Sequence, residues 1–268
     1  MRVRCVKYIR LRKLILTETN RVSYYRLPNL EPFPNLIHGI FTRNGGFSKG
    51  SFDSLNVSLS VGDDLKNVMR NRKVVSGCMN NGELVFTKQV HDRHVIIVSE
   101  RAADSALSET NLTGDALITD INNKMLVIKT ADCQAVLLYD PVKNVVANVH
   151  SGWRGSINNI IGATIDAMKE NYNCNPFYML AGISPSLGPC CAEFINYKKE
   201  IPGQFWKYKD SDFNFDFWAL SADQLSGAGV MPGNIYSCNV CTKCNKDLFY
   251  SYRGEKTTGR LATVIGLK

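Results

Sequence analysis

Short apolar runs, rich in β-branched residues and divided by polar turns, follow one another through the middle of the chain. Runs of this length and composition are typical of β-strands. The pattern predicts strands at 36–42, 84–90, 94–99, 115–119, 124–131, 135–140 and 145–150, and later at 177–184, 235–239, 249–253 and 262–267.

Helical spacing of apolar residues is found in fewer places. Residues 67–79 form one candidate helix, which Asp63 or Asp64 can cap, and residues 156–172 form a second, with Ser156 at the cap position. Two further helical stretches lie around 194–200 and 217–229. Strands therefore outnumber helices, and the pattern predicts an α/β domain with a mixed sheet or two packed sheets covered by helices.

Three potential metal ligands stand at the ends of predicted strands. His91, Cys133 and His150 each lie where an apolar run begins or stops. If those strands share one sheet edge, two imidazoles and a thiolate converge with no fourth protein ligand evident. Three ligands and an open position are typical of catalytic zinc, whereas structural zinc is enclosed by four ligands.

Length and composition describe an ordinary globular chain. It has 268 residues, of which 44% are hydrophobic and 21% charged, and these values suit one large domain. No apolar run approaches the ~18 residues of a membrane span. The apolar stretch near the N-terminus is too short for a signal peptide, so we expect a cytoplasmic protein that does not enter a membrane.

The positive charge is concentrated at the N-terminus. The chain carries a net charge of +8, and residues 1–13 contain six basic and no acidic residues, which leaves 8 − 6 = +2 for the rest. We therefore predict a basic tail at 1–20 and a single catalytic domain at 21–268. A nearly neutral body argues against nucleic acid as a partner.

The nine cysteines are an odd number in a chain without a secretory signal, which argues against a disulfide framework. Cys190 and Cys191 are adjacent, and Cys238, Cys241 and Cys244 form a C-x2-C-x2-C run. That spacing could bind zinc or complete a site with another cysteine, but three half-buried thiols at a strand end are the interpretation we favour from sequence.

Several common catalytic motifs are absent. No GxGxxG follows a strand, and no GxSxG is present. Residues 45–51 superficially resemble a phosphate-binding loop, but the lysine precedes the second glycine instead of following it. Dinucleotide binding, ATP hydrolysis and serine-esterase chemistry therefore have no support.

A series of longer motifs resembles one known family. From about residue 36 onward the chain contains HGIFTRNGGFSKGSFDSLNVS, KQVHDRHV, GDALIT, TADCQAVLLYD, NVHSGWRGSINNII, GISPSLGPCCAEF and FYSYRGEKTTGRLATVIGL. In this order they resemble the YfiH/laccase-domain family, bacterial purine nucleoside phosphorylases long labelled polyphenol oxidases. The resemblance implies a single layered domain of the α-β-β-α type.

The resemblance also implies a cofactor and a set of reactions. It assigns one zinc ion to His91, Cys133 and His150, and it implies phosphorolysis of adenosine, inosine and methylthioadenosine together with deamination of adenosine. The partners would then be a purine nucleoside and phosphate. The sequence departs from the family at Cys238 and Cys244, because only Cys241 is expected there.

Other polar residues are candidates for substrate contacts. Ser151 and Arg154 lie between a predicted strand and helix, where backbone N–H groups favour an anion, and Arg43 beside two glycines is a second candidate for phosphate or ribose. Asp132 could act as a general acid or base, or orient a ligand imidazole. Further candidates are Gln89, two residues before His91, as well as Asn56 and His38, whereas Gly114-Asp115 could be only a turn and Trp153 is better explained by packing.

Two other functions remain open. The old family label suggests copper-dependent phenol oxidation, with Met125 as an axial ligand, and Cu²⁺ could replace Zn²⁺ in vitro. The whole chain has only four histidines, too few for a multicopper centre. The second alternative is a metal-free cysteine hydrolase or deamidase that uses Cys133 with His150 or His91 as base. The sequence leaves the protein's oligomeric state, monomer or homodimer, undecided.

Overall fold

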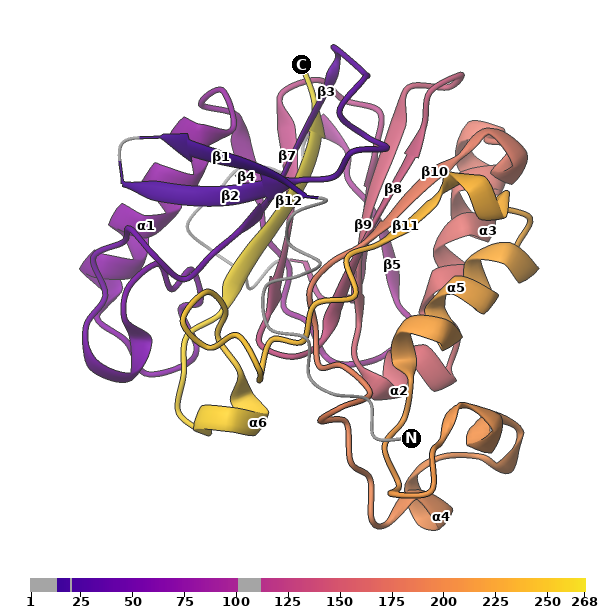
Figure 1. The fold of residues 1–268 in the computed structure, drawn as a ribbon. Coiled ribbons are helices and arrows are strands. Elements are labelled where there is room, and N and C mark those ends of the chain that lie inside the picture. The colour runs from indigo at the N-terminus through magenta and orange to yellow at the C-terminus, as the bar shows by residue number, and fades with distance from the viewer. Residues whose placement is uncertain (1–13, 20, 101–111) are drawn as a thin grey trace.

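The first of two β-sheets runs through the side of the molecule that carries α1 (Figure 1). The computed structural model describes residues 14–19, 21–100 and 112–268. The strands of the first six-stranded sheet lie in the order β1 (Ile15–Thr19), β2 (Val22–Arg26), β3 (Leu36–Phe41), β12 (Leu261–Leu267), β7 (Lys124–Thr130) and β4 (Glu83–Val85). Only the β4–β7 pair is parallel.

The second six-stranded sheet carries the central part of the chain. Its order is β11 (Ile235–Ser237), β10 (Leu180–Ile183), β8 (Gln134–Asp140), β9 (Val145–Ser151), β6 (Ala116–Thr119) and β5 (Val95–Ile97). The edge pairs β10–β11 and β5–β6 are parallel and the central pairs are antiparallel. Both sheets are therefore mixed.

Helices cover the outer faces of the two sheets (Figure 1). One apolar cluster lies between α1 (Leu65–Cys78) and the first sheet, and another lies between the second sheet and α3 (Ile160–Tyr172) with α5 (Phe217–Gly227). The third lies between the sheets, so that along β8 Val136 and Leu138 face the helices whereas Leu137 and Tyr139 face the other sheet. This alternation yields four layers and confirms the α-β-β-α prediction.

One buried side chain connects the sheets directly. Asn148 in β9 is fully buried, and its amide nitrogen donates to the carbonyl oxygens of Leu126 at 2.9 Å and Thr263 at 2.8 Å. A buried amide needs such partners, and these partners belong to the first sheet. The bonds therefore hold β9 in place against β7 and β12, directly before the site residue His150.

The predicted helices form with one change of boundary. Asp64 caps α1 by accepting the N–H of Asn67, as predicted. The expected single helix at 156–172 is instead two helices, α2 (Trp153–Ile157) and α3. Asn159, in a left-handed conformation, caps α3, so Ser156 is not the cap; it lies inside α2, which starts at once after β9.

Other boundaries also differ from the sequence expectation. Residues 249–253 are not a strand, because Ser251 caps the short helix α6 (Tyr252–Glu255); α4 (Tyr197–Glu200) is equally short. The predicted strand 84–90 is reduced to β4. Residues 15–19, within the range predicted as a tail, pair with β2 as β1, and the basic residues 1–13 lie outside the described residues.

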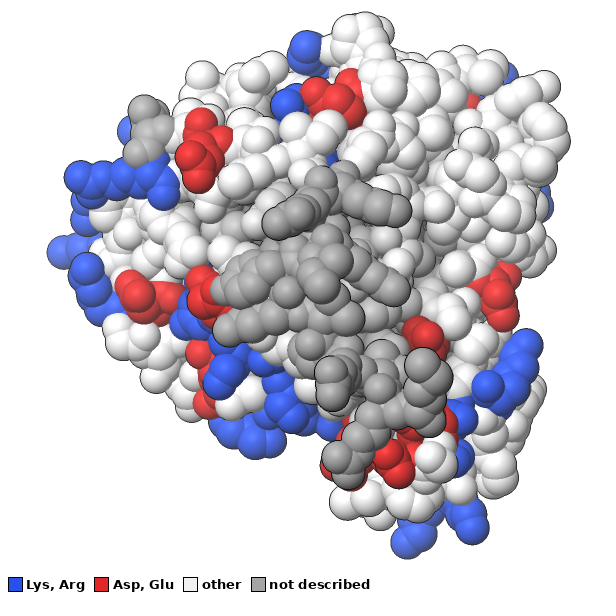
Figure 2. Space-filling view, in the orientation of Figure 1, with Lys and Arg blue, Asp and Glu red and all other residues white. Residues whose placement is uncertain are grey.

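Charged side chains are spread over the surface. On the face shown in Figure 2, Lys and Arg lie mostly at the margins with Asp and Glu among them. In the part of the chain that the structure describes, no helix has the length and apolar character to cross a bilayer.

Candidate active site

Two neighbouring strands bring Cys133 and His150 together. Cys133 immediately precedes β8 and His150 lies near the end of β9, and the antiparallel register pairs Ala135 with His150. His91 approaches from the loop after β4, with a positive φ of 62°. Gly152 permits this approach, because a Cβ there would lie 3.1 Å from the Cys133 sulfur and 3.0 Å from the His91 ring.

The three side chains are spaced as metal ligands are. The Cys133 sulfur lies 3.9 Å from Nε2 of His91, and the rings of His91 and His150 are 4.7 Å apart, edge to face. All three potential ligand atoms lie within 4.8 Å of one another. A tetrahedral zinc with usual bond lengths would separate sulfur and nitrogen by about 3.6 Å, so the trio could hold a metal ion with little movement.

A buried carboxylate supports both histidines. Asp115 is fully buried, and its oxygens accept the backbone N–H groups of Val90, His91 and Asp92 at 3.2, 2.9 and 2.9 Å. Its Oδ1 also lies 2.8 Å from Nδ1 of His150. This contact leaves Nε2 of His150 for a metal, as in carboxylate–histidine–zinc arrangements. The sequence offered only one signal, an aspartate directly before a buried strand.

The electrostatics of the site favour a thiolate. Burial alone would raise the pKa of Cys133, but the charge and hydrogen bonds of His150 and His91 lower it to about 6. Burial would lower the pKa of His150, whereas the Cys133 thiolate and Asp115 raise it to about 9. Burial opposes ionisation of Asp115 too, yet the hydrogen bond with His150 and the backbone N–H groups hold its pKa below the usual value. The lowered pKa of Cys133 favours its thiolate, the form of cysteine that binds a metal ion.

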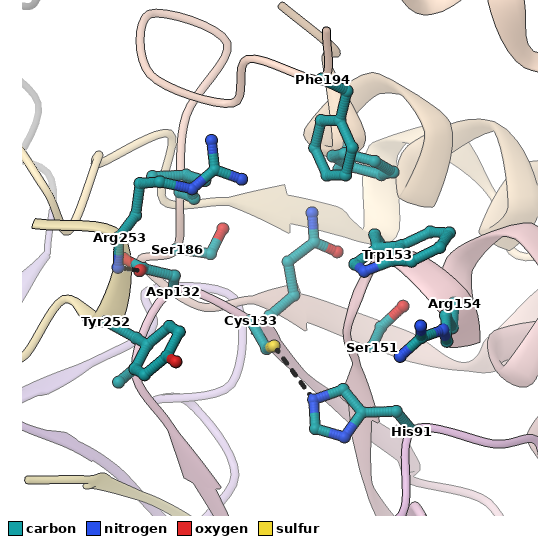
Figure 3. Close-up of a pocket in the computed structure, with 14 residues that line it drawn as sticks. His91, Asp132, Cys133, Ser151, Trp153, Arg154, Ser186, Phe194, Tyr252 and Arg253 are labelled. Carbon is teal, nitrogen blue, oxygen red and sulfur yellow. Dashed lines mark hydrogen bonds between the residues drawn. The ribbon is translucent and has the colours of Figure 1, made fainter. Parts of the chain in front are cut away.

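A cavity of about 340 Å³ opens over two of the three residues, His91 and Cys133. Figure 3 shows Cys133 and His91 at its floor, with Arg154 beside them on one side and Arg253 on the opposite side. The remaining lining residues are mostly aromatic or small and polar: Ala131, Asp132, Gln134, Ser151, Trp153, Ser186, Leu187, Phe194, Phe217 and Tyr252. This size and mixture are typical of a small-molecule site.

One lining side chain has an unused hydrogen-bonding group. Gln134 is 2% exposed, and its Oε1 accepts a short hydrogen bond from the Ser221 hydroxyl of α5. Its amide nitrogen has no hydrogen-bond partner among the described residues. A buried polar group without a partner costs about 1–3 kcal/mol, so this donor is a candidate contact for a ligand in the cavity. Sequence reasoning did not single it out.

The structure brings several predicted residues into the cavity. Asp132, Ser151 and Arg154 line it together with His91 and Cys133. The Asp132 carboxylate is occupied by protein donors, since it accepts the Thr242 hydroxyl at 2.7 Å and the Arg253 N–H at 2.6 Å. Helix α2 behind Ser151 is only five residues long, so its dipole contributes less to anion binding than the sequence suggested.

Four predicted residues lie elsewhere and have protein partners. The Gln89 amide exchanges two hydrogen bonds with the backbone of Lys129. Arg43 pairs with Glu255 at 2.9 Å and covers the Tyr250 ring. Asn56 bonds to residues 58, 63 and 260, and His38 accepts the Leu27 N–H at 2.8 Å. None of the four lines the cavity.

Fold and site together define a class: a four-layer α/β protein with a candidate metal centre of two histidines and one cysteine, which borders a small-molecule cavity through His91 and Cys133. The chain belongs to the family described as multi-copper polyphenol oxidoreductase laccase, whose model matches residues 37–268. This finding confirms the resemblance inferred from the sequence motifs.

Curated and solved relatives are similar over most of the chain. The purine nucleoside phosphorylase YlmD of Geobacillus stearothermophilus is 31% identical over 88% of this chain and 91% of its own. The purine nucleoside phosphorylase YfiH of Escherichia coli is 29% identical over 84% and 91%. The crystal structure of the YfiH protein of Bacillus licheniformis superposes with a TM-score of 0.84 at 29% identity, covering 94% of this chain and 99% of that one.

Proposed function

We propose that this protein is a zinc-dependent purine nucleoside phosphorylase that also deaminates adenosine. The observation that carries the proposal is the grouping of His91, Cys133 and His150, of which His91 and Cys133 lie at the floor of a cavity with an arginine on each side. The curated relatives named purine nucleoside phosphorylase support the same substrates, a purine nucleoside and phosphate. Seven cysteines among the described residues are free and suit a reducing cytoplasm, whereas Cys244 is disulfide-bonded.

Zinc is the metal that the donor set suits best. One thiolate, two imidazoles and no further protein ligand among the described residues make an open site of the catalytic kind, with the Asp115–His150 contact as its support. A bound zinc would supply Lewis acidity toward a substrate oxygen or a water molecule. Copper binds nitrogen and sulfur donors tightly as well, so we expect that Cu²⁺ can replace Zn²⁺ in vitro.

Phosphate binding is assigned to the arginines of the cavity. Arg154 is exposed beside Ser151 on one wall, and Arg253 lies on the other. Guanidinium groups suit phosphate because they donate paired N–H bonds to its oxygens. Arg253 is partly used, since one nitrogen donates to the Glu193 carbonyl at 2.8 Å. Arg154 has no hydrogen bond of this kind to any residue that the structure describes and is therefore the stronger candidate.

The purine base is assigned to the aromatic part of the cavity. Trp153 and Phe194 meet edge to face at 5.9 Å, and Phe194 meets Phe217 at 5.5 Å. Such rings offer flat apolar surface to a base. The free amide nitrogen of Gln134 can donate to a base nitrogen or to the oxygen of hypoxanthine. Because the Ser221 hydroxyl can also accept, the amide can turn over and accept from the amino group of adenine.

A substitution at the thiol tests the proposal. Cys133→Ala should abolish phosphate-dependent release of free base and ribose 1-phosphate, and also the conversion of adenosine to inosine, because the metal loses a ligand. Cys78→Ala, a half-buried thiol of α1, is the matched control and should keep both activities. Products are separated by chromatography with and without phosphate. Phosphorolysis retained in folded Cys133→Ala protein would refute the proposal.

A metal-free cysteine hydrolase is the second candidate. Cys133, His150 and Asp115 follow one another as nucleophile, base and orienting carboxylate, which is the order of a cysteine protease triad. Tightly bound zinc would occupy the thiolate and exclude this chemistry. Zinc analysis with alkylation of Cys133 distinguishes the two: a metal-free protein with a rapidly alkylated Cys133 favours the hydrolase.

Multicopper oxidase chemistry does not fit the donors present. The chain has four histidines, and His38 lies away from the site, bonded to Leu27. His94 is exposed and outside the cavity. Two imidazoles and one thiolate cannot hold a trinuclear copper cluster besides a mononuclear one.

A further inference from the structure

Four cysteines from two loops meet behind the wall of the active-site cavity. Cys190 and Cys191 lie in the loop after β10, and Cys241 and Cys244 lie in the loop after β11. All four sulfur atoms lie within 4.8 Å of one another, with Cys244 at 3.7 Å from Cys190 and 3.5 Å from Cys191. This thiol cluster shares no residue with the His91 trio.

The spacing of the cluster is that of ligands around one ion. Four thiolates at the usual zinc–sulfur bond length of ~2.3 Å stand about 3.8 Å apart at the corners of a tetrahedron. Cys238, the remaining cysteine of the C-x2-C-x2-C run, is separate: it is 3% exposed within the apolar cluster between the sheets. The group of four therefore contains Cys190 and Cys191 and does not contain Cys238.

The surroundings of Cys241 suit negative charge. The backbone N–H groups of Gly188 and Cys244 both point at the Cys241 sulfur, and the ammonium group of Lys243 lies near Cys191. N–H donors and a cation stabilise thiolates, which are the form that binds metal. Gly188 fits closely here, since a Cβ would lie 3.1 Å from that of Cys241.

We propose that Cys190, Cys191, Cys241 and Cys244 form a second, structural metal site that takes Zn²⁺ in the reduced protein. Cys190, Cys191 and Cys241 are free thiols. Cys244 is disulfide-bonded in the structure, so the complete site is assigned to protein in which a thiol reductant has opened that bond. Four thiolates close the coordination sphere, which marks a structural site and excludes a reacting water.

Hydrogen bonds connect the two loops of the thiol cluster to the wall of the cavity. The two loops already exchange hydrogen bonds, Ser186 N–H to the Val240 carbonyl at 3.1 Å and Thr242 N–H to the Ser186 carbonyl at 3.0 Å. Both also hold Asp132, through the Leu187 N–H at 2.8 Å and the Thr242 hydroxyl at 2.7 Å. Since Asp132, Ser186 and Leu187 line the cavity, an ion at the thiol cluster would fasten the wall opposite His91.

Metal analysis of reduced protein tests this site separately from the proposed activity. After desalting with a phosphine reductant, wild type should hold about two zinc ions per chain, and both Cys133→Ala and Cys241→Ser about one. Cys238→Ala, the matched control from the same cysteine run, should hold the wild-type amount. An unchanged zinc content in folded Cys241→Ser protein would overturn the proposal.

A second measurement avoids dependence on how Cys241→Ser folds. Cobalt added to reduced, metal-free Cys133→Ala protein should produce intense sulfur-to-cobalt charge-transfer bands, because among the described residues only the thiol cluster then offers tetrahedral thiolate ligands. Absence of those bands would overturn the proposal. Their presence in a protein without phosphorylase activity would reject the proposed function and leave this site standing.

Discussion

Replacing Asp115 by Asn tests how the buried carboxylate supports the candidate metal centre. The change keeps the side chain's shape, but one carboxylate oxygen becomes an NH₂ group. Oδ1 accepts the His91 N–H and faces Nδ1 of His150, and Oδ2 accepts the N–H groups of Val90 and Asp92. Whichever way the amide turns, its NH₂ group meets two donors. Two charge-assisted hydrogen bonds are lost, each worth about 1.5–3 kcal/mol.

The expected result is weaker metal binding at His91, Cys133 and His150. Loss of such a supporting carboxylate typically reduces metal affinity about 10–100-fold. His91 adds to the effect, because its left-handed backbone costs a non-glycine residue about 1–2 kcal/mol, and the bond from Asp115 helps to hold it. Folding should be affected less than metal binding, because the amide oxygen of the new Asn side chain can still accept backbone N–H groups.

The assay is competition for zinc with a chelator of known affinity. The ion of interest is the one bound at His91, Cys133 and His150, which is identified as the zinc that is missing from Cys133→Ala protein. Asp92→Asn is the matched control, because the exposed Asp92 side chain accepts, within the described part of the chain, only the neighbouring Arg93 N–H. Affinity within about twofold of wild type in Asp115→Asn would refute the supporting role of this carboxylate.

Three further substitutions probe the cavity and the core. Arg154→Ala should raise the KM for phosphate at least about tenfold and change the KM for nucleoside little, because a guanidinium–phosphate pair is lost; steady-state kinetics with each substrate varied would reject the assignment if the order were reversed. Gln134→Leu should reduce kcat/KM about tenfold for both adenosine and inosine, and an unchanged value for either would exclude the amide as a base contact. For His38, burial and nearby Arg26 lower the pKa to about 4, so the folded protein binds fewer protons than the unfolded chain between pH ~6.5 and ~4. As the pH falls through that range, the free energy of unfolding should decrease by up to about 3 kcal/mol. His38→Gln should flatten this dependence of unfolding free energy on pH, measured by urea titration at each pH; parallel pH profiles in wild type and variant would contradict this.

The sequence predicts the strands of the second sheet well because each is a short apolar run bounded by polar turns. β6, β8 and β9 match such runs closely. Local patterns predict less where the chain makes compact turns: the 249–253 run looks like a strand, yet Phe249 and Tyr250 are buried as core residues and Ser251 caps a helix. Apolar residues of that kind fill a core in either conformation.

The site was predictable where its residues stand at strand ends. His91, Cys133 and His150 could be found by position and motif, and the structure brings them together. Asp115 and Gln134 could not, because an aspartate after a glycine reads as a turn and a glutamine at the start of a strand carries no signal of its own. The thiol cluster required knowing that residues 190–191 and 241–244 fold side by side, a long-range pairing that spacing does not encode.

The place of β12 in the first sheet has a consequence for how the chain folds during synthesis. β12 follows every other strand in the chain, yet it lies in the interior of its sheet, paired with β3 on one side and β7 on the other. Until residues 261–267 leave the ribosome, β3 and β7 have unpaired inner edges, and such edges invite pairing with other chains. The nascent protein is therefore most exposed to aggregation just before its synthesis reaches this strand, and a chain cut before Leu261 would lack the strand that joins the two halves of the sheet.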